Sequence, residues 1–220
     1  ASMPEARTDP GGYGHAFGNP MGGYMSLICF KNGSLAREQV KEELGLEWSD
    51  FGRDALAGTP MGNGGRVMLP FYEPEITPRV ESGGPVFINW PDGERGAGEM
   101  ARAVLEGQFA NMWQHSRWLG CETDTILLTG GASQNDGIAQ TVANVFGTPV
   151  KRLEVTNSAA LGAGMRAAVA AGLATLADLE AAFCQARPGS QVDPEPGSVE
   201  AYDDFKETFH QALRDSFSGL

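Results

Sequence analysis

Apolar and polar positions in the middle of the chain form a pattern that predicts a strand, a glycine turn and a helix. Residues 126–129 are apolar or β-branched and stop at the pair Gly130–Gly131, as a buried strand before a tight turn would. From Ile138 onward, apolar residues recur at helical spacing until Gly147, which predicts an amphipathic helix that ends at this glycine. Such a unit places a turn and a helix start at the edge of a sheet.

A second strand and a second helix are predicted directly afterwards. Residues 150–155 favour a strand, and Asn157 or Ser158 is suited to cap the helix that follows. That helix opens with residues 159–164, which carry almost no side-chain bulk. We therefore expect this helix to pack closely against the glycine turn and to leave room for a flat base.

Outside this region the same patterns predict further elements. Ser34 and Ser198 are expected to cap the helices that follow them. In the last of these helices, apolar residues recur along one side and predict a face that docks on the domain core. The expected elements are strands over 24–30 and 67–72 and helices over 34–44, 98–118 and 198–217.

Two segments rich in proline and glycine predict irregular backbone. Residues 1–20 are expected to form a leading loop, and residues 187–197 a linker to the last helix. The chain has 220 residues, of which 41% are hydrophobic, and this is enough for one sizeable core. We therefore expect a single α/β domain over 1–220.

The charge balance argues against some classes of partner. The chain has 16 basic and 28 acidic residues, a net charge of −12, and no cluster of lysine or arginine, so we expect neither nucleic acid nor an anionic membrane as a partner. Its longest weakly polar run, 159–177, is broken by Arg166 and glycines, so no membrane span is expected. The cysteines at 29, 121 and 184 form neither a metal motif nor a disulfide framework, which indicates reduced thiols in a cytoplasmic protein.

The pair Gly130–Gly131 is a candidate ligand-binding turn. Without a Cβ, the backbone admits a ligand close to the free N–H groups of the helix start, and nucleotides are often held in this way. The turn also carries Ser133, Gln134 and Asn135, which hydrogen-bond without charge. Its spacing fits neither a Walker A loop nor G-x-G-x-x-G. A tight strand-to-helix turn without a ligand is the alternative.

Three segments together resemble the adenosine-binding part of the FGGY carbohydrate kinases. The first reads Thr-Gly-Gly-Ala-Ser-Gln-Asn over 129–135, and the other two lie at 145–150 and 157–163. This resemblance implies a ribonuclease H-like α/β domain of the actin/hexokinase superfamily, with a mixed central sheet and helices on both faces. It also implies that the chain is the carboxy-terminal, nucleotide-binding domain of such a kinase, with the amino-terminal sugar-binding domain absent from the chain.

Residues 24–38 resemble the xylulokinase branch of this family, and the run Trp-Ser-Asp-Phe at 48–51 follows in the same order. The branch implies D-xylulose as the sugar that the intact enzyme phosphorylates. In those proteins the tryptophan lies against the nucleotide, and for Trp48 the alternative is a core position beside a helix. Alternatives for the whole chain are a kinase for another ketose or polyol, such as ribulose or glycerol, and a non-enzymatic actin-like nucleotide-binding module.

The resemblance also implies the ligands and the placement of the chemistry. FGGY kinases transfer the γ-phosphoryl group of ATP to a sugar hydroxyl, with an aspartate as general base and Mg²⁺ on the phosphates. We expect that aspartate upstream of Ala1, no catalytic residue or metal ligand within 1–220, and Mg²⁺ held mainly by the phosphates and the missing domain. Asn135 is expected to hydrogen-bond the adenine or ribose. The implied ATP- and ADP-binding residues are Trp48, Gly130, Gly131, Ala132 and Asn135.

One acidic residue in a predicted helix allows two interpretations. Glu106 lies in the segment 103–109, which also resembles the family. It is suited to act as a general base, but we favour a position on the solvated face of the helix. The histidines at 15, 115 and 210 show no spacing typical of a metal site or a catalytic triad.

Overall fold

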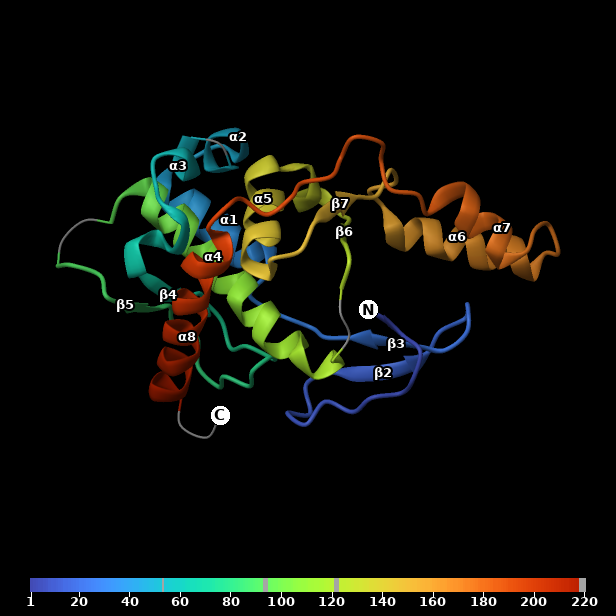
Figure 1. Ribbon diagram of the computed structural model, residues 1–220, viewed down its shortest axis with the longest axis horizontal. Coiled ribbons are helices and arrows are strands. Elements are labelled where there is room, and N and C mark those ends of the chain that lie inside the picture. Colours follow the sequence, from blue (N-terminus) through green and yellow to red (C-terminus); the bar gives the residue numbers. More distant parts are fainter. Residues whose placement is uncertain (53, 93–94, 121–122, 218–220) are drawn as a thin grey trace.

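The computed structural model describes residues 1–52, 54–92, 95–120 and 123–217. Helices dominate the fold, and the strands are short (Figure 1). The α-helices are α1 (Ser34–Leu44), α2 (Trp48–Gly52), α3 (Asp54–Ala57), α4 (Ala97–Ser116), α5 (Asp136–Phe146), α6 (Ser158–Ala170), α7 (Leu176–Phe183) and α8 (Ser198–Ser216). Short 3-10 helices are η1 (Met61–Gly65), η2 (Arg117–Leu119) and η3 (Gly131–Gln134). The strands are β1 (Ser2–Met3), β2 (His15–Gly18), β3 (Tyr24–Leu27), β4 (Val67–Leu69), β5 (Val86–Ile88), β6 (Ile126–Leu128) and β7 (Val150–Arg152).

The long helix α4 forms the centre of the main body (Figure 1). All residues from Met100 to Asn111 are buried, because α1, α3, α5, α8 and β4 all pack against this helix. Gly107 is essential to the contact with β4, since a Cβ at this position would meet the backbone carbonyl of Met68. The helix expected over 98–118 is therefore confirmed, with its last turn formed by η2.

Within the described residues the strands form three small sheets, so the expectation of one mixed central sheet with helices on both faces is corrected. β1, β3 and β2 make an antiparallel sheet, β4 and β5 an antiparallel pair, and β6 and β7 a parallel pair in which Leu127 lies opposite Lys151. No strand in the described ranges exceeds four residues, which leaves little edge to pair with further strands. Leu127 is 53% exposed, so β6 is not the buried strand that its apolar sequence predicts.

Both segments that were expected to be irregular contain ordered pairing. Within 1–20, β1 and β2 pair with β3, so the leading segment is in part an antiparallel sheet. Residues 187–197 run beside β7, where Val150 and Val192 exchange two backbone hydrogen bonds of 2.9 and 2.8 Å. A segment at the edge of a sheet forms only alternate backbone hydrogen bonds, so it tolerates proline and glycine. Because these residues usually indicate a loop, the sequence pattern did not predict this pairing.

The helix ends follow local chemistry, with two corrections. Gly147 has a left-handed φ of 62° and ends α5 as expected. Asn157 caps α6, because its side-chain oxygen accepts the backbone N–H of Ala160, the third residue of the helix. Ser34 and Ser198 are the first residues of their helices rather than the caps, since a glycine occupies the cap position before each.

The last helix α8 packs on the main body, whereas α6 and α7 extend away from it (Figure 1). The docking face expected on α8 is confirmed. Within α6, only Met165 is buried, and a Cβ at Gly162 or Gly164 would meet no atom within 4 Å. The expectation that this helix packs closely against the glycine turn is therefore wrong. The buried aromatic and leucine residues of α8 are Tyr202, Phe205, Phe209 and Leu213.

Candidate functional site

An open cleft of about 650 Å³ lies where the glycine turn meets α1 and α2. Its walls come from α1, the start of α2, the short helix η3 and the start of α5. This volume is in the range of sites that hold small molecules and cofactors. The lining residues are Ser34, Arg37, Glu38, Trp48, Ser49, Gly131, Ala132, Gln134, Asn135 and Ile138.

The glycine turn gives the cleft a wall of nearly bare backbone. Gly130 has a φ of 84°, and its N–H donates to the Thr156 carbonyl at 3.1 Å, which directs the chain away from β6. The Ser133 hydroxyl closes the turn by donating to the Gly130 carbonyl at 2.7 Å. A Cβ at Gly130 or Gly131 would meet no atom within 4 Å, so the space beside the turn is open.

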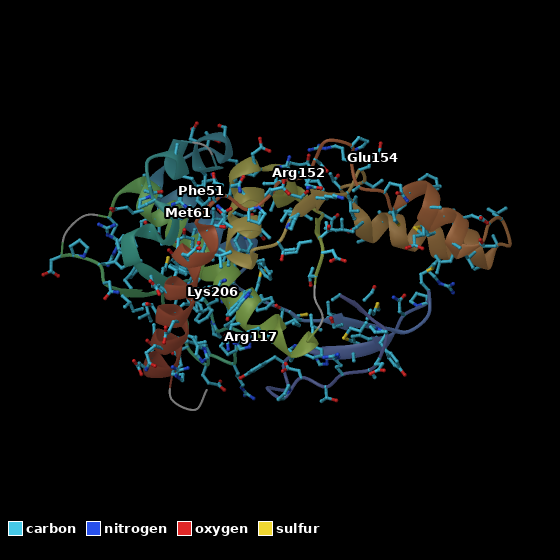
Figure 2. All side chains as sticks on the ribbon, in the orientation of Figure 1. Phe51, Met61, Arg117, Arg152, Glu154 and Lys206 are labelled. Atoms are coloured by element: carbon cyan, nitrogen blue, oxygen red, sulfur yellow. The ribbon has the colours of Figure 1, made fainter. Side chains whose placement is uncertain are left out.

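Trp48 borders the same cleft and is held by two contacts. Phe51, labelled in Figure 2, is fully buried and packs edge-on against the indole, with ring centroids 5.5 Å apart. The Lys41 ammonium lies 5.7 Å from the indole centroid, in reach of a cation–π contact. Trp48 is 39% exposed, so part of its ring remains available to a ligand. It is a cleft residue rather than a core aromatic.

Asn135 is at the junction between the turn, α2 and α5. Its side-chain oxygen accepts the Ile138 N–H at 3.1 Å and so caps α5. Its side-chain NH₂ donates to the Trp48 carbonyl at 3.3 Å. The amide NH₂ has two N–H donors and the amide oxygen has two lone pairs, and these bonds use one of each. One N–H and one lone pair of Asn135 therefore remain for a ligand.

Two glycines outside the turn allow α2 and α5 to approach each other closely. A Cβ at Gly52 would meet the Asn135 side chain, and a Cβ at Gly137 would meet the Gly52 carbonyl. Both positions are therefore required for the placement of Trp48 against the turn. Sequence reasoning missed them, and the available signal was a glycine inside each of two helical patterns.

The wall formed by α1 was also missed. Ser34, Arg37 and Glu38 all line the cleft, and their i, i+3 and i+4 spacing places them on one face of the helix. Arg37 donates to the side-chain oxygen of buried Gln108 at 2.7 Å. Burial lowers the pKa of the Arg37 guanidinium, and the nearby Glu38 carboxylate raises it.

The structure brings most of the predicted residues together. Trp48, Gly131, Ala132 and Asn135 all line the cleft. Gly130 does not line it and instead sets the direction of the turn. The start of α6 contributes no lining residue, because this helix extends away from the main body (Figure 1). The cleft therefore lies between α1, α2 and α5, and not between the starts of α5 and α6.

Comparison with known proteins shows the family to which the chain belongs. Residues 8–171 match the C-terminal domain of the FGGY family of carbohydrate kinases. The chain belongs to this family. This FGGY domain is 39% identical over 199 residues to the xylulose kinase of Mus musculus, which covers 86% of the chain and 36% of the mouse protein. The chain thus spans about a third of that relative.

Two solved structures show the same fold. A ligand-bound xylulose kinase from Lactobacillus acidophilus superposes with a TM-score of 0.83 at 22% identity, over 99% of this FGGY chain and 44% of that one. A gluconate kinase from the same organism superposes with a TM-score of 0.82 at 22% identity, over 99% of this chain and 45% of that one. These structures indicate a mixed α/β domain of the kind found at the C-terminus of FGGY kinases.

Glu106 of this FGGY domain lies away from the cleft and is fully buried, so the expected solvated position is wrong. One of its oxygens accepts hydrogen bonds from the Tyr202 hydroxyl at 2.6 Å and from the Gly62 N–H at 3.0 Å. Arg102 lies 3.2 Å from the same oxygen. Burial raises the pKa of Glu106 to about 7, against the opposing effect of these three donors. Its contacts make it a link between α4, α8 and η1.

The described part of the FGGY domain contains no group of three or more histidine, cysteine or acidic residues arranged to hold a metal ion. Cys29 and Cys184 are free thiols, and Cys121 lies outside the described residues. Within the described ranges, no helix combines the length and apolar character that crossing a membrane requires.

Proposed function

We propose that this chain is the nucleotide-binding half of an ATP-dependent sugar kinase and that ATP or ADP occupies the cleft. The observation that supports this proposal is the open space beside Gly131 in a cleft that Trp48 also lines. A purine in that space would lie against the indole ring. Its phosphates would reach the N–H groups at the starts of η3 and α5, where the helix dipole favours negative charge.

Each predicted site residue has a role in this proposal. Gly130 sets the direction of the turn, Gly131 leaves room for the nucleoside, and Ala132 keeps side-chain volume small at the start of η3. Trp48 flanks the base. Asn135 uses its remaining N–H to bind adenine or ribose while its other bonds hold α5 and Trp48 in place.

We further propose D-xylulose as the sugar, with D-xylulose 5-phosphate as the product. The mouse protein that is 39% identical to this chain is a xylulose kinase. In this proposal the aspartate that accepts the sugar hydroxyl proton, and most of the sugar contacts, belong to an amino-terminal domain outside these 220 residues. The chain alone then binds nucleotide without transferring phosphate, because phosphoryl transfer depends on positioning both substrates. A cytoplasmic location is part of the proposal.

The described residues do not fit a resident Mg²⁺ site. Glu38 is the one carboxylate among the described residues that line the cleft. Mg²⁺ prefers several oxygen ligands in octahedral geometry and commonly shares them with phosphate oxygens. In our proposal the ion arrives with the nucleotide and is held by its phosphates and by the other domain.

Calorimetric titration with ADP tests the proposed nucleotide site. Gly131→Val should preserve the fold, since its Cβ meets no protein atom, and should lower ADP affinity at least tenfold by filling the ligand space. Gly18→Val in β2 is the matched control, because that position is also open and lies outside the cleft. Unchanged ADP affinity in Gly131→Val would contradict the site.

A kinase for a different sugar is the second candidate function. The gluconate kinase superposes about as well as the xylulose kinase, so the fold of this half does not select the sugar. A protein in which this chain is joined to an amino-terminal FGGY domain should be assayed with D-xylulose, ribulose, gluconate and glycerol. We expect the highest kcat/KM with D-xylulose, and turnover of any sugar by the 220-residue chain alone would contradict the proposed division of roles.

A further inference from the structure

The α1 wall of the cleft carries an adjacent positive and negative side chain. Among the described lining residues, Arg37 and Glu38 are the only charged ones. They lie on the helix face that Ser34 also occupies, so both side chains border the space in which the proposed nucleoside lies. The rest of the described lining is uncharged and cannot provide this pairing of a strong donor with a strong acceptor.

The direction of Arg37 is set by a relay of hydrogen bonds. One Arg37 nitrogen donates to the Gln108 side-chain oxygen at 2.7 Å. The NH₂ of Gln108 donates in turn to the backbone carbonyls of Asn32 at 2.8 Å and Gly33 at 2.6 Å. Gln108 is 5% exposed, so it forms a rigid support from the central helix α4. Within the described chain, the other guanidinium N–H groups of Arg37 have no protein acceptor and are available to a ligand.

Glu38 complements this donor. Its side chain is exposed and makes no side-chain hydrogen bond to any described residue. An ionised carboxylate only accepts hydrogen bonds, whereas a guanidinium only donates them. The wall therefore presents one fixed donor beside one acceptor.

This pattern matches one purine better than the other. Adenine presents an acceptor at N7 beside the donor amine at N6, whereas guanine presents acceptors at both N7 and O6. We propose that Arg37 and Glu38 read this edge of the base and select adenine over guanine nucleotides. The inference rests on the proposed function, since it requires a nucleoside in the cleft. With guanine, the Glu38 carboxylate would face the O6 carbonyl, and two acceptors cannot pair.

The test compares ADP and GDP affinities by calorimetry in the intact chain and in Glu38→Gln. The native chain should bind ADP at least tenfold more tightly than GDP. Glu38→Gln should reduce that ratio several-fold, mainly by improving GDP binding, because the new amide can donate to O6. Glu42→Gln is the matched control, since Glu42 is exposed one turn further along α1 and does not line the cleft. It should leave the ratio unchanged.

Arg37→Met provides an independent arm. Because N7 is common to both purines, this variant should weaken ADP and GDP binding by a similar factor of about ten and leave their ratio nearly unchanged. Loss of thermal stability is checked separately by circular dichroism, because Arg37 also supports Gln108.

Two outcomes would overturn the inference, and they are distinguishable. In the first outcome the native chain binds ADP, and Glu38→Gln shows the same ratio of ADP to GDP affinity as the native chain. This outcome contradicts the base-reading role and leaves the proposed nucleotide site intact. A native chain that binds neither nucleotide contradicts the proposed function itself, and the reading of the base is then overturned with it.

Discussion

The side-chain amide of Asn135 joins Trp48 to the start of helix α5. Its nitrogen donates to the Trp48 carbonyl at 3.3 Å, and its oxygen accepts the Ile138 N–H at 3.1 Å. Trp48 and Asn135 are 87 positions apart in the sequence. The aromatic wall of the cleft is therefore positioned by the residue that also caps the helix behind the glycine turn.

Substitutions at Asn135 should separate these two roles. Asn135→Ala removes the cap and should lower the free energy of unfolding by about 1 kcal/mol. Asn135→Asp keeps a good cap acceptor but can donate neither to the Trp48 carbonyl nor to a bound nucleoside, so stability should stay close to that of the native chain while ADP affinity falls several-fold. Urea denaturation and ADP titration measure the two effects. Native ADP affinity in Asn135→Asp would show that both the bond to Trp48 and the proposed bond to the nucleoside are dispensable.

The close approach of α2 to α5 should not tolerate a methyl group. In Gly137→Ala the new Cβ would meet the Gly52 carbonyl, so α2 must shift, and we expect a loss of about 1–3 kcal/mol in stability. ADP affinity should fall as well, because Trp48 begins α2. Gly164→Ala is the control, since that helical position is open and alanine favours helix there. Equal stability of the two variants would argue against the tight contact.

Gly107 should be equally restrictive in the centre of the fold. A Cβ at this position would meet the Met68 carbonyl, which belongs to a fully buried strand and cannot move cheaply. Gly107→Ala should therefore lower the free energy of unfolding by about 1–3 kcal/mol, despite the better helix propensity of alanine. A urea midpoint at or above that of the native chain would show that β4 adjusts without cost.

Glu106 should make stability depend on pH. Its pKa is about 7 in the folded chain and 4.5 ordinarily, so between these values the folded state binds more protons than the unfolded state. The free energy of unfolding should accordingly fall as pH rises from 4.5 to 7, by up to roughly 3 kcal/mol, and then level off. Protonated Glu106 thus contributes stability that is fully present below pH 4.5.

The comparison variant for this prediction is Glu106→Gln, which has no titrating group at the position. Urea denaturation at pH 5, 6, 7 and 8 should show a smaller decrease for this variant than for the native chain. Glu42→Gln removes an exposed carboxylate and should retain the native decrease. Parallel pH profiles for the native chain and Glu106→Gln would contradict the titration of Glu106 in this window.

Sequence patterns were reliable where a structure depends on nearby residues. The helix at 34–44, the amphipathic helix from Ile138 onward, its end at Gly147 and the buried face of α8 all follow from spacing and capping. The glycine turn was also evident, because a strand that stops at two glycines leaves few conformations available.

Patterns failed where the partner is distant in the chain. An acidic residue at position 106 looks solvated, yet Tyr202 and Gly62 converge on it from segments 96 and 44 residues away. The strand at 126–128 looks buried, yet Leu127 at its centre is 53% exposed and its other two residues are only half-buried. In both cases burial depends on which elements pack together, and local periodicity carries no such information.

The sequence by itself determined the main helices, the bare glycine turn and the resemblance to FGGY kinases, because these reside in local spacing and short motifs. Only the tertiary structure decided that Trp48 and the turn share a cleft with the α1 wall, and that Arg37 is held there by Gln108. The physical reason is that side chains far apart in the chain meet only when helices pack. Where they meet is governed by close contacts such as that between Gly52 and Gly137.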